Sequence, residues 1–321
     1  MQRRRLGNTE LEFTTIGLGT WAIGGGDWKY GWGPQDPSEA IDGLLAGLDF
    51  GINWIDTAPV YGDGASEKLV GKALRQAARE DVLVATKCSR KMLPDGSVTG
   101  ILDAESVKAE CEQSLKRLGV EVIDLYQMHW PEPDSQIEEG WAAMIDLKQE
   151  GKVREIGVSN FNVPQMERLE AMHPISSLQP PYNMLQREVE DTLFSYCSAQ
   201  KMGIIGYSPL AKGLLSGAMT CARAAALDPS DHRSRDPKFA TPELEANLQL
   251  VDRLQLFAKN HSHSVAELAI AWTLRKLEVT SAIVGVRNRA QIEGTHAAAD
   301  WQLTQEEIAQ IEQILSTLDQ V

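Results

Sequence analysis

Four side chains whose combined chemistry suits acid–base catalysis follow short apolar runs along this chain. Asp56 directly follows one such run, and Tyr61 comes five residues later. Lys87 and His129 each follow a further run. A free tyrosine titrates at about 10, too high for efficient proton donation at neutral pH, but a nearby ammonium stabilises phenolate and lowers that pKa. We therefore predict that Asp56 orients Lys87 and that Lys87 lowers the pKa of Tyr61.

The predicted reaction is proton donation from Tyr61 to a carbonyl oxygen, which a neutral His129 would hydrogen-bond and aim. None of the four groups can supply a hydride, so reduction of the carbonyl requires a nicotinamide cofactor. Each residue alone also has an ordinary structural explanation, because lysines and histidines commonly stand at strand ends without catalysing a reaction. The hypothesis therefore requires a fold that brings all four to one place.

Eight short apolar runs, separated by helical patterns, indicate the elements that must position these side chains. Most runs are continuous and not alternating, which is typical of parallel strands covered by helices. The eight predicted strands are Thr15–Leu18, Ile52–Ile55, Val82–Thr86, Val122–Gln127, Val153–Val158, Ser176–Leu178, Gly203–Gly206 and Ser281–Val284. This alternation favours an α/β fold, a closed (β/α)8 TIM barrel, over an open doubly wound sheet. We expect residues 1–321 to form that single domain.

Start and stop signals support the intervening helices. Asp36-Pro37-Ser38-Glu39 is a capping box with proline at the first helical position, Gly151 ends a helix before the fifth strand, and Thr304 opens a terminal helix. Two segments fall outside the alternation. The first thirteen residues predict a β-hairpin that closes the bottom of the barrel. Gly217–Pro242, after strand seven, is too long for a simple connection and predicts a functional loop over the site.

Barrel active sites lie at the C-terminal ends of the strands. The residues just past the eight runs are polar or aromatic: Trp21, Asp56 with Tyr61, Lys87, His129 with Trp130, Ser159 with Asn160, Gln179, Tyr207 and Arg287. We place Trp21, Trp130, Trp28 and Trp32 in the substrate pocket, with the core as an equal alternative for the last two. An aromatic mouth with few charges suits small neutral carbonyl compounds.

Composition and targeting signals exclude several functions. The 321-residue chain has a net charge of −14 and no basic stripe, which argues against a nucleic-acid partner. No run of about 18 apolar residues is present, so no membrane span is expected, and the basic start lacks the apolar stretch of a signal peptide. Four widely spaced cysteines without a CxxC motif are typical of reduced thiols in a cytosolic protein. We expect a cytoplasmic enzyme, monomeric or weakly homo-oligomeric, with a small-molecule substrate and no metal.

Seven motifs along the chain carry a family resemblance. They are Gly17-Leu18-Gly19-Thr20-Trp21, Asp56-Thr57-Ala58-Pro59-Val60-Tyr61-Gly62, Thr86-Lys87, Met128-His129-Trp130, Gly157-Val158-Ser159-Asn160-Phe161, Tyr207-Ser208-Pro209-Leu210 and Val284-Gly285-Val286-Arg287. Over essentially its whole length the chain resembles the aldo-keto reductases. It looks most like bacterial members of the general-stress or glyoxal-reductase type, through Leu178-Gln179-Pro180-Pro181-Tyr182-Asn183 and Asp236-Pro237-Lys238-Phe239.

The resemblance implies an NADPH-dependent reductase of small aldehydes, α-dicarbonyls or hydroxyaldehydes, with alcohol or polyol oxidation as the reverse reaction. It makes Asp56, Tyr61, Lys87 and His129 the catalytic tetrad, with Tyr61 as the general acid. It assigns to the cofactor Ser159, Asn160 and Gln179 at the carboxamide, Tyr207 on the nicotinamide ring, the backbone of Ser208, Leu210 and Gly213 along the pyrophosphate, Arg287 at the 2′-phosphate and Gln291 at the adenine. Beyond Gln291 this chain has Gly294-Thr295 where the family often has Glu-Asn, which leaves the adenine contacts and the strictness of the NADP preference open.

Other interpretations of the same residues are possible. The main alternative function is an NADP(H)-sensing regulatory subunit of the same fold with very slow turnover. Metal-dependent barrel chemistry would need several carboxylates at the strand ends, where only Asp56 is available. Gly17–Ala22 matches a loose Rossmann pattern, but a glycine-rich stretch follows where a helix must begin. His261-Ser262-His263 lacks carboxylate or cysteine partners for a metal, and Cys88 is a conceivable reactive thiol because it adjoins Lys87.

Overall fold

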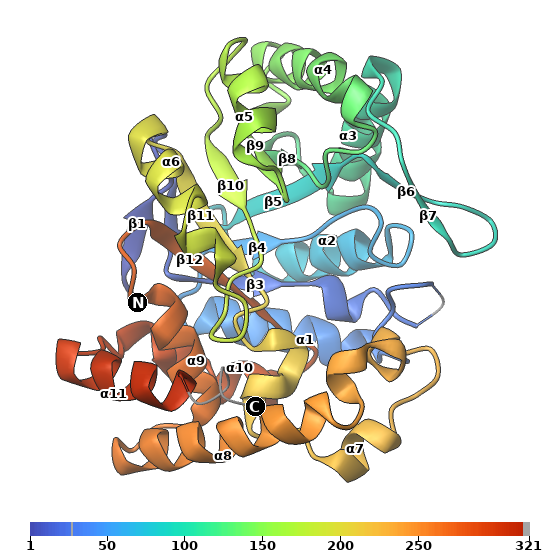
Figure 1. Cartoon of the computed structure of the whole chain (residues 1–321). Coiled ribbons are helices and arrows are strands. Elements are labelled where there is room, and N and C mark those ends of the chain that lie inside the picture. Colours follow the sequence, from blue (N-terminus) through green and yellow to red (C-terminus); the bar gives the residue numbers. More distant parts are fainter. Residues whose placement is uncertain (27, 317–321) are drawn as a thin grey trace.

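Eight parallel strands close into one barrel that is covered by helices (Figure 1). The computed structural model describes residues 1–26 and 28–316. In barrel order the strands are β3 (Ile16–Gly19), β4 (Trp54–Asp56), β5 (Leu83–Cys88), β8 (Ile123–Met128), β9 (Val153–Ser159), β10 (Ser177–Gln179), β11 (Gly203–Tyr207) and β12 (Val279–Gly285), and β12 pairs with β3 to close the ring. The predicted (β/α)8 barrel and its eight strands are confirmed with small shifts at the strand ends, and the open-sheet alternative is wrong.

The helices follow the start and stop signals in the sequence. The side chain of Asp36 accepts hydrogen bonds from the backbone N–H groups of Ser38 and Glu39, and Thr304 forms a reciprocal capping box with Glu307. The α-helices of the barrel layer are α1 (Pro37–Asp49), α2 (Ala65–Ala77), α3 (Ala104–Leu118), α4 (Ile137–Gln149), α5 (Val163–Glu170), α6 (Leu193–Gln200), α8 (Glu243–Asn260), α9 (Val265–Leu274), α10 (Arg289–Glu293) and α11 (Gln305–Leu315). Short 3-10 turns lie between them: η1 (Trp21–Ile23), η2 (Asp134–Gln136), η3 (Glu188–Glu190) and η7 (His296–Asp300).

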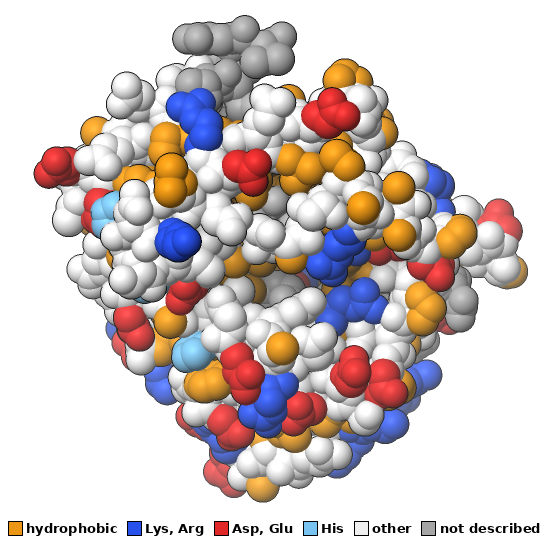
Figure 2. Space-filling view, turned by 90° about the horizontal axis from the view of Figure 1, so that it is seen from below, with side chains coloured by type: hydrophobic (Ala, Val, Ile, Leu, Met, Phe, Trp, Pro, Cys, Tyr) orange, Lys and Arg blue, Asp and Glu red, His pale blue; other side chains and the backbone are white. Residues whose placement is uncertain are grey.

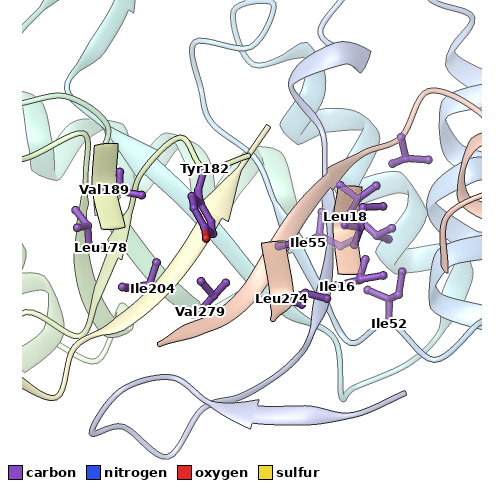
Figure 3. Packing of buried hydrophobic residues seen from close by; sticks show 14 of the residues in the cluster. Ile16, Leu18, Ile52, Ile55, Leu178, Tyr182, Val189, Ile204, Leu274 and Val279 are labelled. Carbon is purple, nitrogen blue, oxygen red and sulfur yellow. The ribbon is translucent and has the colours of Figure 1, made fainter. Parts of the chain in front are cut away.

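Apolar side chains on the outer faces of the strands fill the space between barrel and helices (Figure 3). Leu18 of β3 packs under α1, where a Cβ added at Gly47 would overlap its side chain. Glycine at that helix position therefore lets α1 approach the barrel closely. Such burial removes about 25 cal/mol of unfavourable hydration per Å² of apolar surface, so this layer fixes the strands and, with them, the strand ends.

The bottom of the barrel is closed by an N-terminal hairpin, as predicted. β1 (Arg3–Arg5) pairs antiparallel with β2 (Glu12–Thr14). Leu6 and Phe13 are fully buried there, and Phe13 stacks on Trp54 inside the barrel with ring centroids 4.5 Å apart. The hairpin therefore covers this end of the barrel.

Two connections at the opposite end are long. A second hairpin, β6 (Arg90–Met92) paired with β7 (Val98–Gly100), follows β5 and was not expected from the sequence. The connection after β11 begins with η4 (Ala211–Ser216). The predicted loop Gly217–Pro242 follows it and contains α7 (Cys221–Ala225), η5 (His232–Arg235) and η6 (Pro237–Phe239). Both connections supply walls of the site described below.

The surface carries charges of both signs. Acidic and basic side chains are interspersed over the face seen in Figure 2. In the whole sequence 45 acidic residues exceed 31 basic ones, so the protein is anionic overall. Within residues 1–26 and 28–316, no helix has the length and apolar character required to cross a membrane.

Candidate active site

The four residues predicted to be catalytic come together at the C-terminal ends of β4, β5 and β8. The Lys87 ammonium nitrogen Nζ lies 2.8 Å from each carboxylate oxygen of Asp56, 2.9 Å from the carbonyl oxygen of Thr57 and 3.5 Å from the Tyr61 hydroxyl. The rings of Tyr61 and His129 meet edge to face with centroids 5.7 Å apart. Carboxylate, ammonium, phenol and imidazole thus form one contiguous group.

Burial controls the protonation of this group. Burial raises the pKa of Tyr61 well above its ordinary value, and the Asp56 carboxylate acts in the same direction. The net pKa of Tyr61 is therefore raised and not lowered as expected from the sequence, with desolvation as the largest cause. Burial lowers the pKa of Lys87, which Asp56 opposes. Burial, aided by Lys87, also holds the pKa of His129 well below its usual range, so the imidazole is neutral as expected and Tyr61 keeps its proton at neutral pH.

A close backbone contact fixes the turn that carries Tyr61. Gly62 has a φ of +64°, and a Cβ at this position would overlap the carbonyl oxygen of Gly24. Only glycine fits such a left-handed position in contact with another backbone. The Tyr61 carbonyl accepts from the N–H of Ser66 at 3.2 Å, which ties the turn to the start of α2. The loop after β3 and the loop after β4 are thereby locked together around the tyrosine.

Gln179 is bonded directly to the acid of the group. Its amide Nε2 donates to Asp56 Oδ1 at 2.9 Å, from β10 across the barrel to β4. The Ser159 hydroxyl donates to the backbone carbonyl of Gln179 at 2.8 Å, which links β9 to β10. One amide hydrogen of Gln179 is therefore already used inside the protein, in addition to the cofactor role that the sequence suggests.

Asn160 is held between two other site residues. Its Nδ2 donates to the backbone carbonyl of His129 at 2.9 Å, and its Oδ1 accepts from the Tyr207 hydroxyl at 2.9 Å. Asn160 has a φ of +63°, a left-handed conformation that asparagine tolerates better than most residues. Tyr207 ends β11, and its ring remains partly exposed at the barrel mouth. The structure therefore brings Ser159, Asn160, Gln179 and Tyr207 to one side of the tetrad.

The backbone after Tyr207 turns back on itself. Ser208, Lys212 and Gly213 have φ values of +57°, +56° and +97°, and the N–H of Gly213 donates to the carbonyl of Leu210 at 2.8 Å. The Lys212 ammonium pairs with Asp236 at 2.8 Å, which ties this turn to the long loop. Successive left-handed residues make concave backbone of the kind that binds anions.

Arg287 and Gln291 lie together beyond the end of β12. The backbone N–H of Arg287 donates to Gln291 Oε1 at 2.8 Å. The Arg287 guanidinium donates to the carbonyl of Trp32 at 3.0 Å, to Gln35 Oε1 at 2.7 Å and to the carbonyl of Pro34. Burial lowers the pKa of Arg287. This residue therefore also anchors the loop after β3, a contact that the sequence did not indicate.

Three of the four predicted pocket tryptophans surround Tyr61. The rings of Trp21 and Trp28 lie 6.5 Å and 6.3 Å from the Tyr61 ring, and Trp32 meets Trp21 edge to face at 5.2 Å. Trp28 is buried and packs in one apolar cluster with Tyr61. Trp130 lies at the rim, 37% exposed, with the Arg90 guanidinium 5.3 Å from its ring.

Four further residues line this region and were not identified from the sequence. The His232 ring stacks on Trp21 at 4.9 Å, and the Arg233 guanidinium lies 4.6 Å from the Trp32 ring. Met92 and Val98 of the β6–β7 hairpin pack against the Tyr61 cluster. The Asp95-Gly96 turn was an available hairpin signal. The pairing of His232 and Arg233 with these tryptophans depends on contacts between distant parts of the chain.

Neither the cysteines nor the pair His261 and His263 adds a reactive group to the site. All four cysteines are free, and burial raises the pKa of Cys88 well above its ordinary value, which makes it a poor nucleophile. His263 stacks on Trp301 with centroids 4.1 Å apart. Across the part of the chain that the structure describes, no three His, Cys, Asp or Glu side chains are grouped as metal ligands.

Comparison with known proteins identifies the family. The family model described as Aldo/keto reductase family matches residues 15–316. The chain belongs to the aldo/keto reductase family. It is 38% identical to the aldo-keto reductase YhdN of Bacillus subtilis, over 98% of this chain and 94% of the relative. It is 32% identical to the NADH-specific methylglyoxal reductase of Escherichia coli, over 99% and 100% of the two chains.

A solved structure of the same family superposes closely. The glycerol dehydrogenase AKR11B4 from Gluconobacter oxydans matches this aldo/keto reductase with a TM-score of 0.87 and 35% identity, over 98% of this chain and 95% of that one. Resemblance in fold and in sequence therefore agree over nearly the whole chain. Membership of this family accounts for a TIM barrel with its site at the C-terminal ends of the strands and for the use of a nicotinamide cofactor.

Proposed function

We propose that this aldo/keto reductase reduces the carbonyl group of small aldehydes, α-dicarbonyls or hydroxyaldehydes, with NADPH as its preferred cofactor. The observation that carries the proposal is the position of Lys87, whose ammonium contacts both Asp56 oxygens and reaches the Tyr61 hydroxyl. Tyr61 donates the proton to the carbonyl oxygen, and neutral His129 hydrogen-bonds the same oxygen and aims it. Alcohol or polyol oxidation is the reverse reaction.

The residues around the tetrad fit a nicotinamide cofactor. Asn160 and Gln179 place their amide groups on one side of the tetrad, and the Ser159 hydroxyl is hydrogen-bonded to both residues. The partly exposed Tyr207 ring offers a stacking face, and the concave backbone of the turn that runs from Ser208 through Leu210 to Gly213 can lie along a pyrophosphate. When bound, the cofactor supplies the hydride that no side chain of the protein can supply.

The preference for NADPH is proposed on the basis of Arg287. A guanidinium is the usual partner of a 2′-phosphate because it offers a planar fork of N–H donors. Arg287 uses some of its donors on the loop after β3, and Gln291 holds its backbone. The E. coli relative is named as NADH-specific, so the cofactor preference of this chain has to be measured directly.

The aromatic surroundings of Tyr61 support a small substrate without charge. Trp21 and Trp28 leave the tyrosine only 8% exposed, and Met92 adds apolar surface. Two relatives are named for methylglyoxal reduction and glycerol dehydrogenation. Methylglyoxal and glyceraldehyde are therefore the substrates that we propose to test first.

We also propose that residues 1–321 work as one domain in a reducing, cytosolic compartment. The barrel uses strands from residue 16 to residue 285, and the four cysteines are unpaired.

The test is a fluorescence titration of the purified protein with NADPH and NADH, followed by nicotinamide absorbance after methylglyoxal or glyceraldehyde is added. Tight binding of NADPH with rapid loss of absorbance is the expected result. Tight binding without turnover on a panel of small aldehydes would favour the NADP(H)-sensing alternative. Failure to bind either nucleotide would contradict both functions.

A further inference from the structure

Two buried polar side chains inside the barrel lack a protein partner. Gln127 of β8 and Ser177 of β10 are both 0% exposed. Within the described residues, neither the amide oxygen nor the amide nitrogen of Gln127 is hydrogen-bonded, and the Ser177 hydroxyl is also unbonded. None of the proposed catalytic or cofactor roles uses either residue.

The side chain of Gln127 faces the barrel interior beside Lys87. Neighbouring residues of β8 define the two faces, because the hydroxyl of Tyr126 donates outward to the Val107 carbonyl on α3 while Leu125 packs in the interior cluster. Side chains alternate along a strand, so Gln127 points inward like Leu125. Gln127 and Lys87 are paired Cα partners in adjacent strands, which are about 4.8 Å apart. The amide therefore flanks the stem of the buried lysine.

Ser177 reaches the same interior space from the other side. Gln127 is paired with Gly157 of β9, and a Cβ added at Gly157 would overlap the Ser177 hydroxyl. The missing side chain of Gly157 thus makes room for Ser177 next to Gln127. Three inward-facing polar side chains form one row across the sheet: Lys87 of β5, Gln127 of β8 and Ser177 of β10. Gly157 of β9 lies between the last two.

An amide buried without hydrogen bonds costs roughly 1–3 kcal/mol by mutational measurements. In proteins such groups are usually hydrogen-bonded by an internal water, which makes about three hydrogen bonds and is costly in free energy to remove. Here two unbonded groups, one with donor and acceptor atoms and one hydroxyl, face the barrel interior from strands on either side of Gly157. Together they offer the donors and acceptors that a bridging water needs.

We propose that Gln127 and Ser177 bind a buried water inside the barrel. This water holds the Gln127 amide in one orientation, and Gln127 thereby acts as a positioning residue for Lys87. The water fixes the direction of the amide dipole and its contact with the lysine stem. A fixed stem keeps Nζ within reach of Asp56, Thr57 and Tyr61 at the distances observed. The water site stands independently of the enzymatic activity, whereas the positioning role rests on the proposed reductase function.

The first test is a high-resolution crystal structure of the wild-type protein. We expect one ordered water within hydrogen-bond distance of the Gln127 amide and of Ser177 Oγ. A direct Gln127–Ser177 hydrogen bond, or bonds to other protein groups with no water between them, would overturn the water site.

The second test compares Gln127→Met, Ser177→Ala and the double variant with Leu125→Met as a matched control on the same interior face. We expect Gln127→Met to lower kcat roughly tenfold, the scale of a small misplacement of a catalytic group, with NADPH Kd and substrate KM changed less than about twofold. The double variant should lose no more than Gln127→Met alone, because both changes remove the same water. Gln127→Asn, which keeps an amide, should recover part of the turnover, and Leu125→Met should retain full turnover.

Thermal unfolding separates these effects from a folding defect. Gln127→Met should retain or raise the Tm, because it removes an amide that needs a water. Full turnover in a folded Gln127→Met variant, or equal losses in Leu125→Met, would overturn the positioning role. A wild-type protein without reductase turnover would overturn that role together with the proposed function, while the crystal structure would still decide the water site.

Discussion

The ammonium of Lys87 lies 2.8 Å from each carboxylate oxygen of Asp56, and the two side chains are 0% and 5% exposed. A buried ion pair adds little net stability, because desolvation offsets the attraction, but removing one partner leaves an uncompensated charge. We therefore interpret the role of Asp56 as keeping the Lys87 ammonium charged and directed at the Tyr61 hydroxyl.

Replacing Asp56 tests whether Lys87 depends on its carboxylate. In Asp56→Asn the buried ammonium loses its counter-charge, so we expect the pKa of Lys87 to fall further and turnover to drop by about 10²-fold, on the scale of acid–base contributions. Denaturant unfolding should report a loss of about 3 kcal/mol, as for broken buried pairs. Unchanged turnover together with unchanged stability would contradict the role given to this pair.

The hydroxyl of Tyr61 can be removed without changing its ring. Tyr61→Phe should leave NADPH binding nearly intact and lower turnover by about 10²-fold or more, because the proton donor is lost. Tyr126→Phe is the matched control, since its buried hydroxyl donates to the Val107 carbonyl on the outer side of the barrel. Single-turnover kinetics measure both variants. Wild-type turnover in Tyr61→Phe would remove Tyr61 from the mechanism.

Cofactor choice can be separated from loop anchoring at Arg287. Because its guanidinium also holds the Trp32 carbonyl, Arg287→Ala should weaken both nucleotides somewhat. The ratio of the two Kd values is the decisive quantity, and we expect NADPH to be weakened about tenfold more than NADH through loss of a charge-assisted bond to phosphate. Arg289→Ala, whose arginine is paired with Asp42, should leave the ratio unchanged. Equal weakening of both nucleotides by Arg287→Ala would place the 2′-phosphate elsewhere.

Glu110 should make stability depend on pH. Burial raises the pKa of this carboxyl from 4.5 to about 7, and its Oε2 lacks a partner among the described residues. The folded state therefore holds the proton more tightly than the unfolded chain. The contribution of Glu110 to the free energy of unfolding is fully present below pH 4.5 and is lost as the pH rises through about 7. The total loss is about 3 kcal/mol.

Glu110→Gln removes this titration. Its Tm should equal or fall slightly below that of the wild type at pH 4.5 and exceed it increasingly from pH 5 to pH 8. A Tm difference that does not change across that range would show that Glu110 does not titrate there. Glu105→Gln, at the exposed start of the same helix, serves as the control for removing a carboxylate from the surface.

The sequence by itself determined the barrel and the identity of its central residues. Continuous apolar runs such as Gly203–Gly206 are typical of parallel strands buried under helices, and local caps such as Asp36 set the helix starts. Because the barrel architecture places strand ends together, Asp56, Lys87 and His129 could be assigned to one mouth before any contact was known.

The tertiary structure decided the electrostatics and the walls of the site. The raised pKa of Tyr61 follows from desolvation, which depends on Trp21 and Trp28 packing over it and not on any local pattern. The bond of Arg287 to the Trp32 carbonyl joins residues 255 positions apart. Such contacts between distant segments are set by packing geometry, which periodicity and spacing do not encode. For the same reason, only the folded barrel reveals that Gln127 lies beside Lys87 and that its amide has no hydrogen-bond partner within residues 1–26 and 28–316.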